Sequence, residues 1–148
     1  MKVVLGADHG GFEMKNQIKQ FLKDKGFDVD DKGALSLDPE DDYVDFAKAV
    51  AQEVAGNQDD RGILFCRSAA GMVIAANKIN NVRAATAFDV KSAVHSREHN
   101  DTNVIALSGD WLDVQKAKEI ISAWIDTAFS PEERHHRRVH KIAELEHA

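Results

Sequence analysis

The stretch that decides the fold is Gly62-Ile-Leu-Phe-Cys66-Arg67-Ser68-Ala69-Ala70-Gly71-Met72-Val-Ile-Ala-Ala-Asn77-Lys78. Its first part is short and fully apolar, which is typical of a buried parallel strand. Its last part is rich in alanine and medium-sized apolar side chains, and predicts a helix packed closely on that strand. Between the two lie the only cysteine of the chain, a hydroxyl and a glycine. The sequence therefore predicts a strand, a tight turn and a helix, with reactive groups in the turn.

This turn is a candidate anion site. A strand that passes through small residues into a helix directs several backbone N–H groups at one point, and the helix dipole adds partial positive charge there. We expect Cys66 to lose its proton more readily than a free thiol in such a place. The alternative is that Cys66 is one more small core residue. Its position favours chemistry, because open α/β sheets bind ligands at the carboxyl ends of their strands.

Length and composition bound the possibilities. The chain has 148 residues, enough for one domain over 1–148, and 30% of them are charged. The net charge of -6 argues against nucleic acid or an anionic membrane as the main partner. A single cysteine leaves no internal disulfide, and the apolar N-terminus is too short for a signal peptide. We therefore expect a cytoplasmic protein.

Strand-like and helix-like segments alternate five times along the chain. Strands are predicted at 2–7, 27–31, 62–66, 82–88 and 104–107. Helices are predicted at 12–25, at 43–55, in the alanine-rich segment after the cysteine turn, from Asp89 to about 99, and from Asp113 to about 128. The capping box Ser130-Pro131-Glu132-Glu133 predicts a final charged helix to about 146. The acidic loop over 34–42 is expected to be solvated.

This alternation predicts an α/β fold. Right-handed crossovers give a doubly wound, Rossmann-like five-stranded parallel sheet with helices on both faces and an extra C-terminal helix. Asp8-His9 follows the first strand and Cys66 the third, so both strands deliver polar groups to the same carboxyl edge. The alternative for Asp8-His9 is an ordinary solvated loop.

Two further polar runs are candidates. Arg97-Glu98-His99-Asn100-Asp101-Thr102-Asn103 could be a helix end and turn, yet its histidine suits proton transfer near neutral pH. The basic cluster from Arg134 to Arg138 could be a solvated helix face. Adjacent histidines inside it point to different sides of a helix, which argues against a shared metal.

Several phosphate-handling families are excluded by single positions. A cysteine phosphatase needs arginine six positions after its cysteine, where Met72 stands, and a phospho-acceptor module needs an acidic residue in place of Cys66. Neither a Walker phosphate loop nor a dinucleotide glycine motif is present.

Five ordered segments resemble B-type ribose-5-phosphate isomerases, which share one family with the galactose-6-phosphate isomerase subunits. The segments are Gly6-x-Asp8-His9-x-Gly11-Phe12, Asp60-Arg61-Gly62-Ile63-Leu64 with Cys66, Ile74-Ala75-Ala76-Asn77-Lys78, Arg97-Glu98-His99-Asn100-Asp101-x-Asn103-Val104 and Arg134-His135-x-x-Arg138-Val139. The resemblance implies an aldose–ketose isomerase without metal or other cofactor that works through a cis-enediolate.

The resemblance also implies catalytic roles. Cys66 would carry the proton between neighbouring carbons, because Met72 stands where some members have a glutamate base. His99 would open the furanose ring, and Ser68 keeps the hydroxyl of the usual threonine. The enediolate oxygen would be held by backbone N–H groups of Arg67, Ser68, Ala69, Ala70 and Gly71.

Binding roles follow in the same way. Asp8 and Asn100 would hold sugar oxygens, while His9, Arg134 and Arg138 would bind the phosphate through charge-assisted hydrogen bonds. Members of the family are homodimers, sometimes doubled to tetramers, with each site shared between subunits. His99 and Asn100 are therefore expected to face Cys66 of a second chain.

Two departures from the family pattern concern the substrate. The family loop is commonly Gly-Thr-Gly-x-Gly, whereas Arg67-Ser68-Ala69-Ala70-Gly71 stands here. Asp110 occupies the place of a phosphate-binding arginine. The implied substrate is ribose 5-phosphate, with tetrose, allose or galactose phosphate as alternatives. A different function is also possible in principle, namely that of a non-catalytic sugar-phosphate binding module. Arg67 is predicted either to pair with Asp110 or to reach the anionic end of the substrate.

Overall fold

Five parallel strands form the centre of the molecule, and the computed structural model describes residues 1–148. The strands are β1 (Lys2–Ala7), β2 (Asp28–Asp31), β3 (Arg61–Cys66), β4 (Ala84–Thr86) and β5 (Val104–Ser108). Their order across the sheet is β2-β1-β3-β5-β4, and every neighbouring pair is parallel. This arrangement confirms the doubly wound α/β fold predicted from the sequence.

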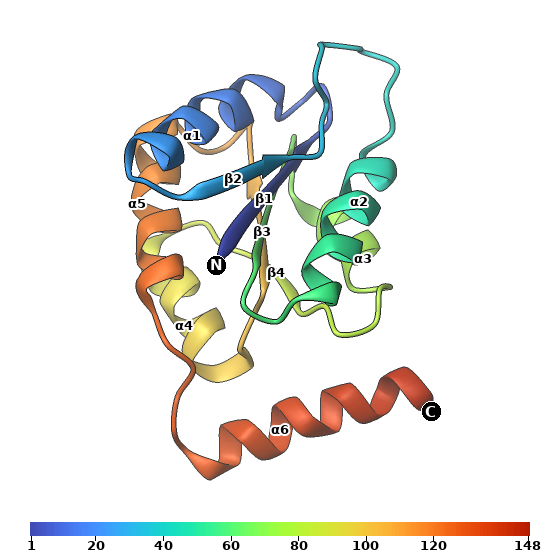
Figure 1. Cartoon of the computed structure of the whole chain (residues 1–148), viewed down its shortest axis with the longest axis vertical. Coiled ribbons are helices and arrows are strands. Elements are labelled where there is room, and N and C mark those ends of the chain that lie inside the picture. The colour runs from blue at the N-terminus through green and yellow to red at the C-terminus, as the bar shows by residue number, and fades with distance from the viewer.

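Helices cover both faces of the sheet (Figure 1). The helices are α1 (Phe12–Asp24), α2 (Tyr43–Gly56), α3 (Ala70–Ala76), α4 (Val90–Asn100), α5 (Val114–Asp126) and α6 (Glu133–Glu144), followed by a short 3-10 turn over Leu145–His147. One hydrophobic cluster joins the sheet to α1, α4 and α5, and the other joins it to α2 and α3. No helix is both long enough and apolar enough to span a membrane.

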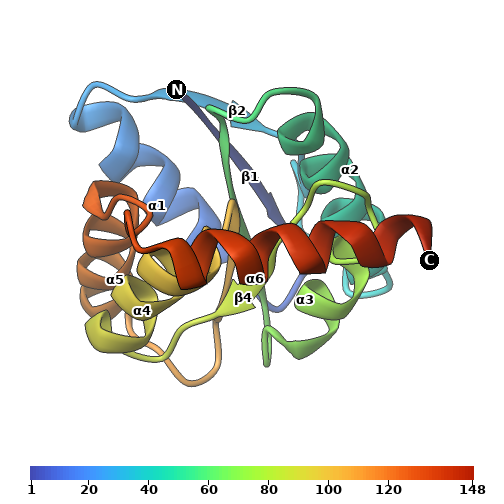
Figure 2. The same cartoon turned by 90° about the horizontal axis from the view of Figure 1, so that it is seen from below.

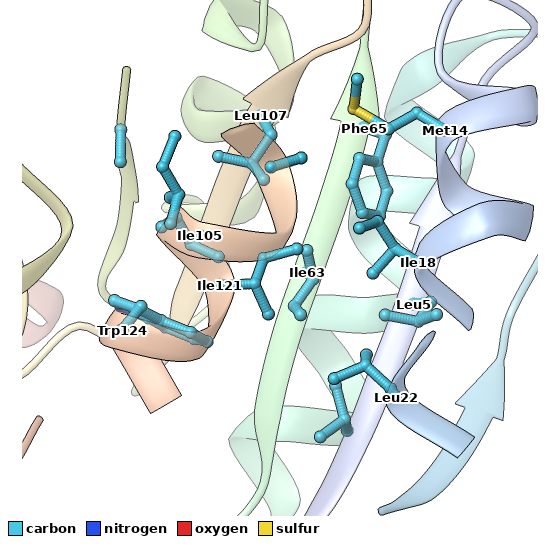
Figure 3. Packing of buried hydrophobic residues seen from close by; sticks show 14 of the residues in the cluster. Leu5, Met14, Ile18, Leu22, Ile63, Phe65, Ile105, Leu107, Ile121 and Trp124 are labelled. Atoms are coloured by element: carbon cyan, nitrogen blue, oxygen red, sulfur yellow. The ribbon is translucent and has the colours of Figure 1, made fainter. Parts of the chain in front are cut away.

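The strands bury both faces, and their side chains alternate between the two clusters. In β3, Ile63 and Phe65 face the α1 and α5 side, while Leu64 and Cys66 face the α2 and α3 side. Figure 3 shows Ile63 and Phe65 packed between side chains of α1 and α5, including Ile18. Burying one such side chain stabilises the fold by roughly 1.5–3 kcal/mol. Cys66 is thereby fixed at the end of a rigid strand.

The predicted helix starts at Asp89 and Asp113 are confirmed. Asp89 accepts a hydrogen bond from Ser92 N at 2.7 Å in a complete capping box, and Asp113 accepts one from Lys116 N at 2.7 Å. Such caps are typically worth about 1 kcal/mol each. The caps fix where α4 and α5 leave the carboxyl edge of the sheet.

The predicted capping box at Ser130 is wrong. Helix α6 begins at Glu133, and its N-cap, Glu132, makes no side-chain capping bond. Ser130 N instead donates to Glu98 O at 3.1 Å, and Ser130 Oγ accepts from Glu132 N at 3.1 Å. The chain is thus held in a turn against α4, and Pro131 lies outside the helix. The fourth strand is also shorter than predicted, because only Ala84–Thr86 pairs with β5.

Helix α6 lies apart from the two covering layers. Figure 1 shows it at the end of the sheet where the strands begin, and Figure 2, viewed from below, shows it crossing that end. His135 is its only buried residue, whereas Ile142 and Leu145 beyond it are 43% and 70% exposed. An amphipathic helix is therefore left with exposed apolar side chains.

Candidate active site

The ends of β1 and β3 form the floor of the candidate site. Ala7 pairs with Phe65, and a Cβ added at Gly11 would lie 2.4 Å from the backbone carbon of Phe65, so only glycine permits this approach. Asp8 Oδ1 accepts hydrogen bonds from Gly10 N at 2.9 Å and Gly11 N at 3.3 Å. Burial raises the pKa of the Asp8 carboxyl, although the neighbouring His9 opposes the change. The paired glycines thus fix Asp8 at the carboxyl edge, as expected.

The turn after β3 holds the cysteine in a tight backbone loop. Ala69 N donates to Cys66 Sγ at 3.1 Å, and Ala69 adopts a left-handed conformation with φ 70°. That conformation favours glycine, the residue expected at this position from the family resemblance. The predicted backbone restriction of the turn is therefore found at one residue, Ala69, as a strained left-handed conformation.

The expectation of an acidified cysteine is contradicted. Burial raises the pKa of the Cys66 thiol, and the nearby Asp8 carboxylate raises it further, while the N–H groups of Ala69, Ser68 and Met72 only oppose this. Helix α3 has seven residues, and the cysteine lies inside the hydrophobic cluster that it forms with α2. Desolvation of the thiolate outweighs the backbone donors in the single chain.

The turn after β5 packs against the cysteine turn. Gly109 N donates to Cys66 O at 2.7 Å, and the Ser108 hydroxyl donates to Arg67 O. This packing brings Arg67 Nη1 to 3.9 Å from Asp110 Oδ2, with both side chains largely exposed. The two departures from the family pattern are therefore neighbours.

His9 is held by a residue that the sequence analysis missed. Its Nδ1 lies 2.8 Å from Asp41 Oδ1, and the same oxygen accepts from His9 N at 3.1 Å. This hydrogen bond is the main reason why the pKa of His9 is raised. The loop over 35–40 is exposed as expected, but the Asp41 side chain is only 9% exposed.

Tyr43 also reaches the site without having been predicted there. A Cβ on Gly71 would lie 2.6 Å from the Tyr43 ring, so the ring covers the start of α3 directly. The only sequence signal for the two residues was their place at the start of α2, where Asp41 precedes the N-cap residue Asp42 and Tyr43 is the first helical residue. Their approach to the first and third strands depends on how the whole loop folds back.

The remaining predicted residues lie at the opposite edge. His99 and Asn100 end α4, shortly before β5 begins at Val104, so they belong to the amino edge of the sheet. The His99 ring lies between those of His95 and His135, with centroid distances of 4.0 Å and 4.2 Å. A cavity of about 480 Å³ adjoins His99 and His135.

Arg134 and Arg138 belong to the same amino-edge group. Both are exposed on α6, where Arg134 Nε lies 2.8 Å from Glu132 Oε2. One chain therefore brings together Asp8, His9, Cys66, Arg67, Ser68, Ala69, Ala70 and Gly71, and keeps them apart from His99, Asn100, Arg134 and Arg138.

Three residues could in principle offer ligands to a metal ion. The ligand atoms of Asp8, His9 and Asp41 all lie within 4.8 Å of one another. His9 Nδ1 already faces Asp41 Oδ1, so a metal would have to displace this ion pair. The geometry is that of a hydrogen-bonded histidine–carboxylate pair, and a site without metal remains the prediction.

Comparisons with known proteins agree with this geometry. The family model for Ribose/Galactose Isomerase matches residues 3–142. The chain is 40% identical to ribose-5-phosphate isomerase B of Escherichia coli over 145 residues, covering 98% of this chain and 96% of the relative. It is 39% identical to D-erythrulose-4-phosphate isomerase of Pectobacterium atrosepticum over 132 residues, covering 87% and 85% of the two chains.

A solved structure extends the likeness to three dimensions. Ribose-5-phosphate isomerase B from Mycoplasma genitalium, with bound ribulose-5-phosphate, superposes with a TM-score of 0.95 at 37% identity, covering 99% of this chain and 96% of that one. The match includes the sheet edge that carries Cys66 and the helix that carries His99. The chain therefore belongs to the ribose/galactose isomerase family and is an aldose–ketose isomerase.

Proposed function

We propose that the protein interconverts ribose 5-phosphate and ribulose 5-phosphate, in an active site that two copies of the chain complete together. The observation that carries the proposal is the arrangement of Cys66, Asp8 and the backbone donors of the 67–71 turn at one sheet edge. Relatives named ribose-5-phosphate isomerase B, about 40% identical over nearly the whole chain, support the choice of substrate.

Proton transfer is assigned to Cys66. Its thiolate takes the proton from the carbon next to the carbonyl and returns it to the neighbouring carbon, through a cis-enediolate. The N–H groups of the turn, from Arg67 to Gly71, stabilise the enediolate oxygen, as preorganised donors do in other enzymes. Burial raises the thiol pKa in the single chain, so the thiolate is the less favoured form of Cys66 before substrate binds.

Ring opening is assigned to His99 of a second chain, with Asn100 beside it. Both lie at the amino edge of the sheet, whereas the Cys66 of their own chain lies at the carboxyl edge. The exposed apolar residues Ile142 and Leu145 of the C-terminal segment favour docking of a second copy. A homodimer, or a tetramer built from two, would bring the two half-sites together, and Arg134 and Arg138 would join His9 at the phosphate.

The turn after Cys66 makes a smaller sugar phosphate the second candidate for the substrate. Arg67 stands in place of a glycine at the edge of the site, and its exposed guanidinium would shorten the space for substrate if it reached the phosphate. The relative that is named for a four-carbon sugar phosphate gives this alternative support.

Solvent deuterium incorporation tests the function directly. The protein is incubated in D2O with four-, five- and six-carbon aldose phosphates, and exchange at the carbon next to the carbonyl is followed by NMR. We expect the largest kcat/KM with ribose 5-phosphate. Faster turnover of a tetrose phosphate would favour the second candidate, and no exchange with any substrate would leave only the binding module.

A further inference from the structure

Asp41 holds His9 at two points through a single carboxylate oxygen. Oδ1 lies 2.8 Å from His9 Nδ1 and accepts the backbone N–H of His9 at 3.1 Å. Asp41 lies 32 positions away along the chain, next to the N-cap residue of α2. The contact therefore fixes both the ring and the main chain of His9 from outside its own loop.

The other carboxylate oxygen of Asp41 points to an ionic role. Oδ2 is buried and has no hydrogen-bond partner, and the whole side chain is only 9% exposed. A carboxylate withdrawn from water in this way requires a compensating positive charge. The His9 ring is the only cationic group within salt-bridge distance of Asp41.

The other charged groups around His9 only partly reinforce this pairing. The pKa of His9 is raised first by the Asp41 hydrogen bond and then by the charge of Asp8, whereas burial and Arg67 lower it. Glu13 of α1 lines the same small cavity as His9, and Asp110 lies beside Arg67. Among these charged groups, Asp41 makes the direct hydrogen bond to the His9 ring, with 2.8 Å between Oδ1 and Nδ1.

We propose that Asp41 is a positioning residue that keeps His9 doubly protonated and leaves its Nε2–H free to bind the substrate phosphate. The inference rests on the proposed function, which assigns the phosphate to His9. The proposal also accounts for the change of charge at position 110. With aspartate in the place of a phosphate-binding arginine, a His9 ring that stays protonated to higher pH supplies part of the missing positive charge.

Asp41→Asn is the test variant, and Glu40→Gln is its matched control. Asparagine keeps an acceptor for the His9 N–H groups but removes the charge, so the fold is expected to survive. Glu40→Gln removes the same charge one position away, where the side chain is exposed, whereas the hydrogen bonds of His9 go to Asp41. Unchanged thermal unfolding of both variants confirms that they remain folded.

The first measurement is the histidine titration by NMR in the free protein. We expect His9 to titrate at lower pH in Asp41→Asn than in the wild type, and Glu40→Gln to match the wild type. A lower His9 pKa in Asp41→Asn than in Glu40→Gln supports the inference independently of any activity measurement. An unchanged His9 titration in Asp41→Asn overturns it.

The second measurement is competitive inhibition by sulfate, a dianion whose own charge is constant between about pH 6 and 9. In Asp41→Asn we expect the inhibition constant to rise about tenfold at pH values between the His9 titrations of the variant and the wild type, and to change less than about twofold below both titrations. In a His9→Gln background the same change should have no effect. An equal loss at every pH, or an undiminished loss in that background, would mean a merely structural role. If the wild type bound sulfate but isomerised nothing, the proposed function would fail while the His9 titration still decided the role of Asp41.

Discussion

Cys66 and His99 lie at opposite edges of the same parallel sheet. Cys66 pairs with Ser108 in the last register of β3 and β5. His99 is the next-to-last residue of α4, and a short turn after this helix leads to Val104, the first residue of β5, which pairs with Gly62. A single chain therefore contains both halves of the proposed chemistry but cannot bring them together.

Replacing Cys66 with alanine should abolish isomerisation while leaving sugar-phosphate affinity nearly unchanged, because it removes the proton carrier and not the phosphate contacts. General bases typically contribute at least about a hundredfold. The check is kcat with ribose 5-phosphate, together with the dissociation constant of the sugar phosphate from a direct binding titration. A variant that retained more than about a hundredth of the wild-type kcat would exclude Cys66 as the base.

The pH dependence of kcat/KM should reflect the raised thiol pKa, because kcat/KM reports the ionisation of the free enzyme. The thiolate is the active form, so a pKa above that of a free thiol moves the rise in kcat/KM to higher pH. Below that pKa, we expect kcat/KM to increase about tenfold per pH unit. A kcat/KM that is constant from about pH 7 to 9 would contradict a base whose pKa is raised in the free enzyme.

Arg67 and Asp110 are expected to be coupled through the phosphate site. Arg67→Gly leaves Asp110 unpaired and should raise KM, since a charge-assisted contact is worth roughly 1.5–3 kcal/mol. Asp110→Arg should lower KM, and the double variant should return towards the wild type. Measuring kcat/KM on four-, five- and six-carbon substrates gives the coupling energy. Wild-type values for both single variants on every substrate would show that the pair has no role.

His99→Ala should slow turnover of the cyclic sugar phosphate far more than that of an open-chain analogue that cannot form a ring. The reason is that ring opening is needed only for the cyclic form, and acid–base assistance is worth about 10²–10⁴-fold. His95→Ala is a matched control on the same helix, because the His95 ring lies tilted against that of His99 but is itself exposed. Equal losses with both substrates would remove ring opening from the role of His99.

Much of the fold could be predicted because its signals are local. The apolar run before Cys66, and the caps at Asp89 and Asp113, each depend on a few neighbouring residues. The capping box at Ser130 failed because α4 binds the backbone of that turn, a contact that spans distant parts of the chain. Local patterns compete with tertiary contacts, and here the tertiary contact prevailed.

The sequence predicted the location of those site residues that lie directly at the ends of strands, and of no others. Asp8, His9 and Cys66 come directly after β1 or end β3, so their common edge follows from topology. Asp41 could not be placed, because a loop brings it to His9 across 32 positions. The raised pKa of Cys66 could not be predicted either, since burial by α2 and α3 is a property of the packed core.

The most direct test of the shared site is a hybrid of two inactive chains. Cys66→Ala and His99→Ala chains, carrying different tags, are co-expressed, and the mixed dimer is purified and assayed with cyclic ribose 5-phosphate. If each site uses Cys66 of one chain and His99 of the other, the hybrid contains one intact site and should show about half of the wild-type activity per dimer. If both residues acted within one chain, each site of the hybrid would carry one defect, and activity no higher than that of the single variants would contradict the account.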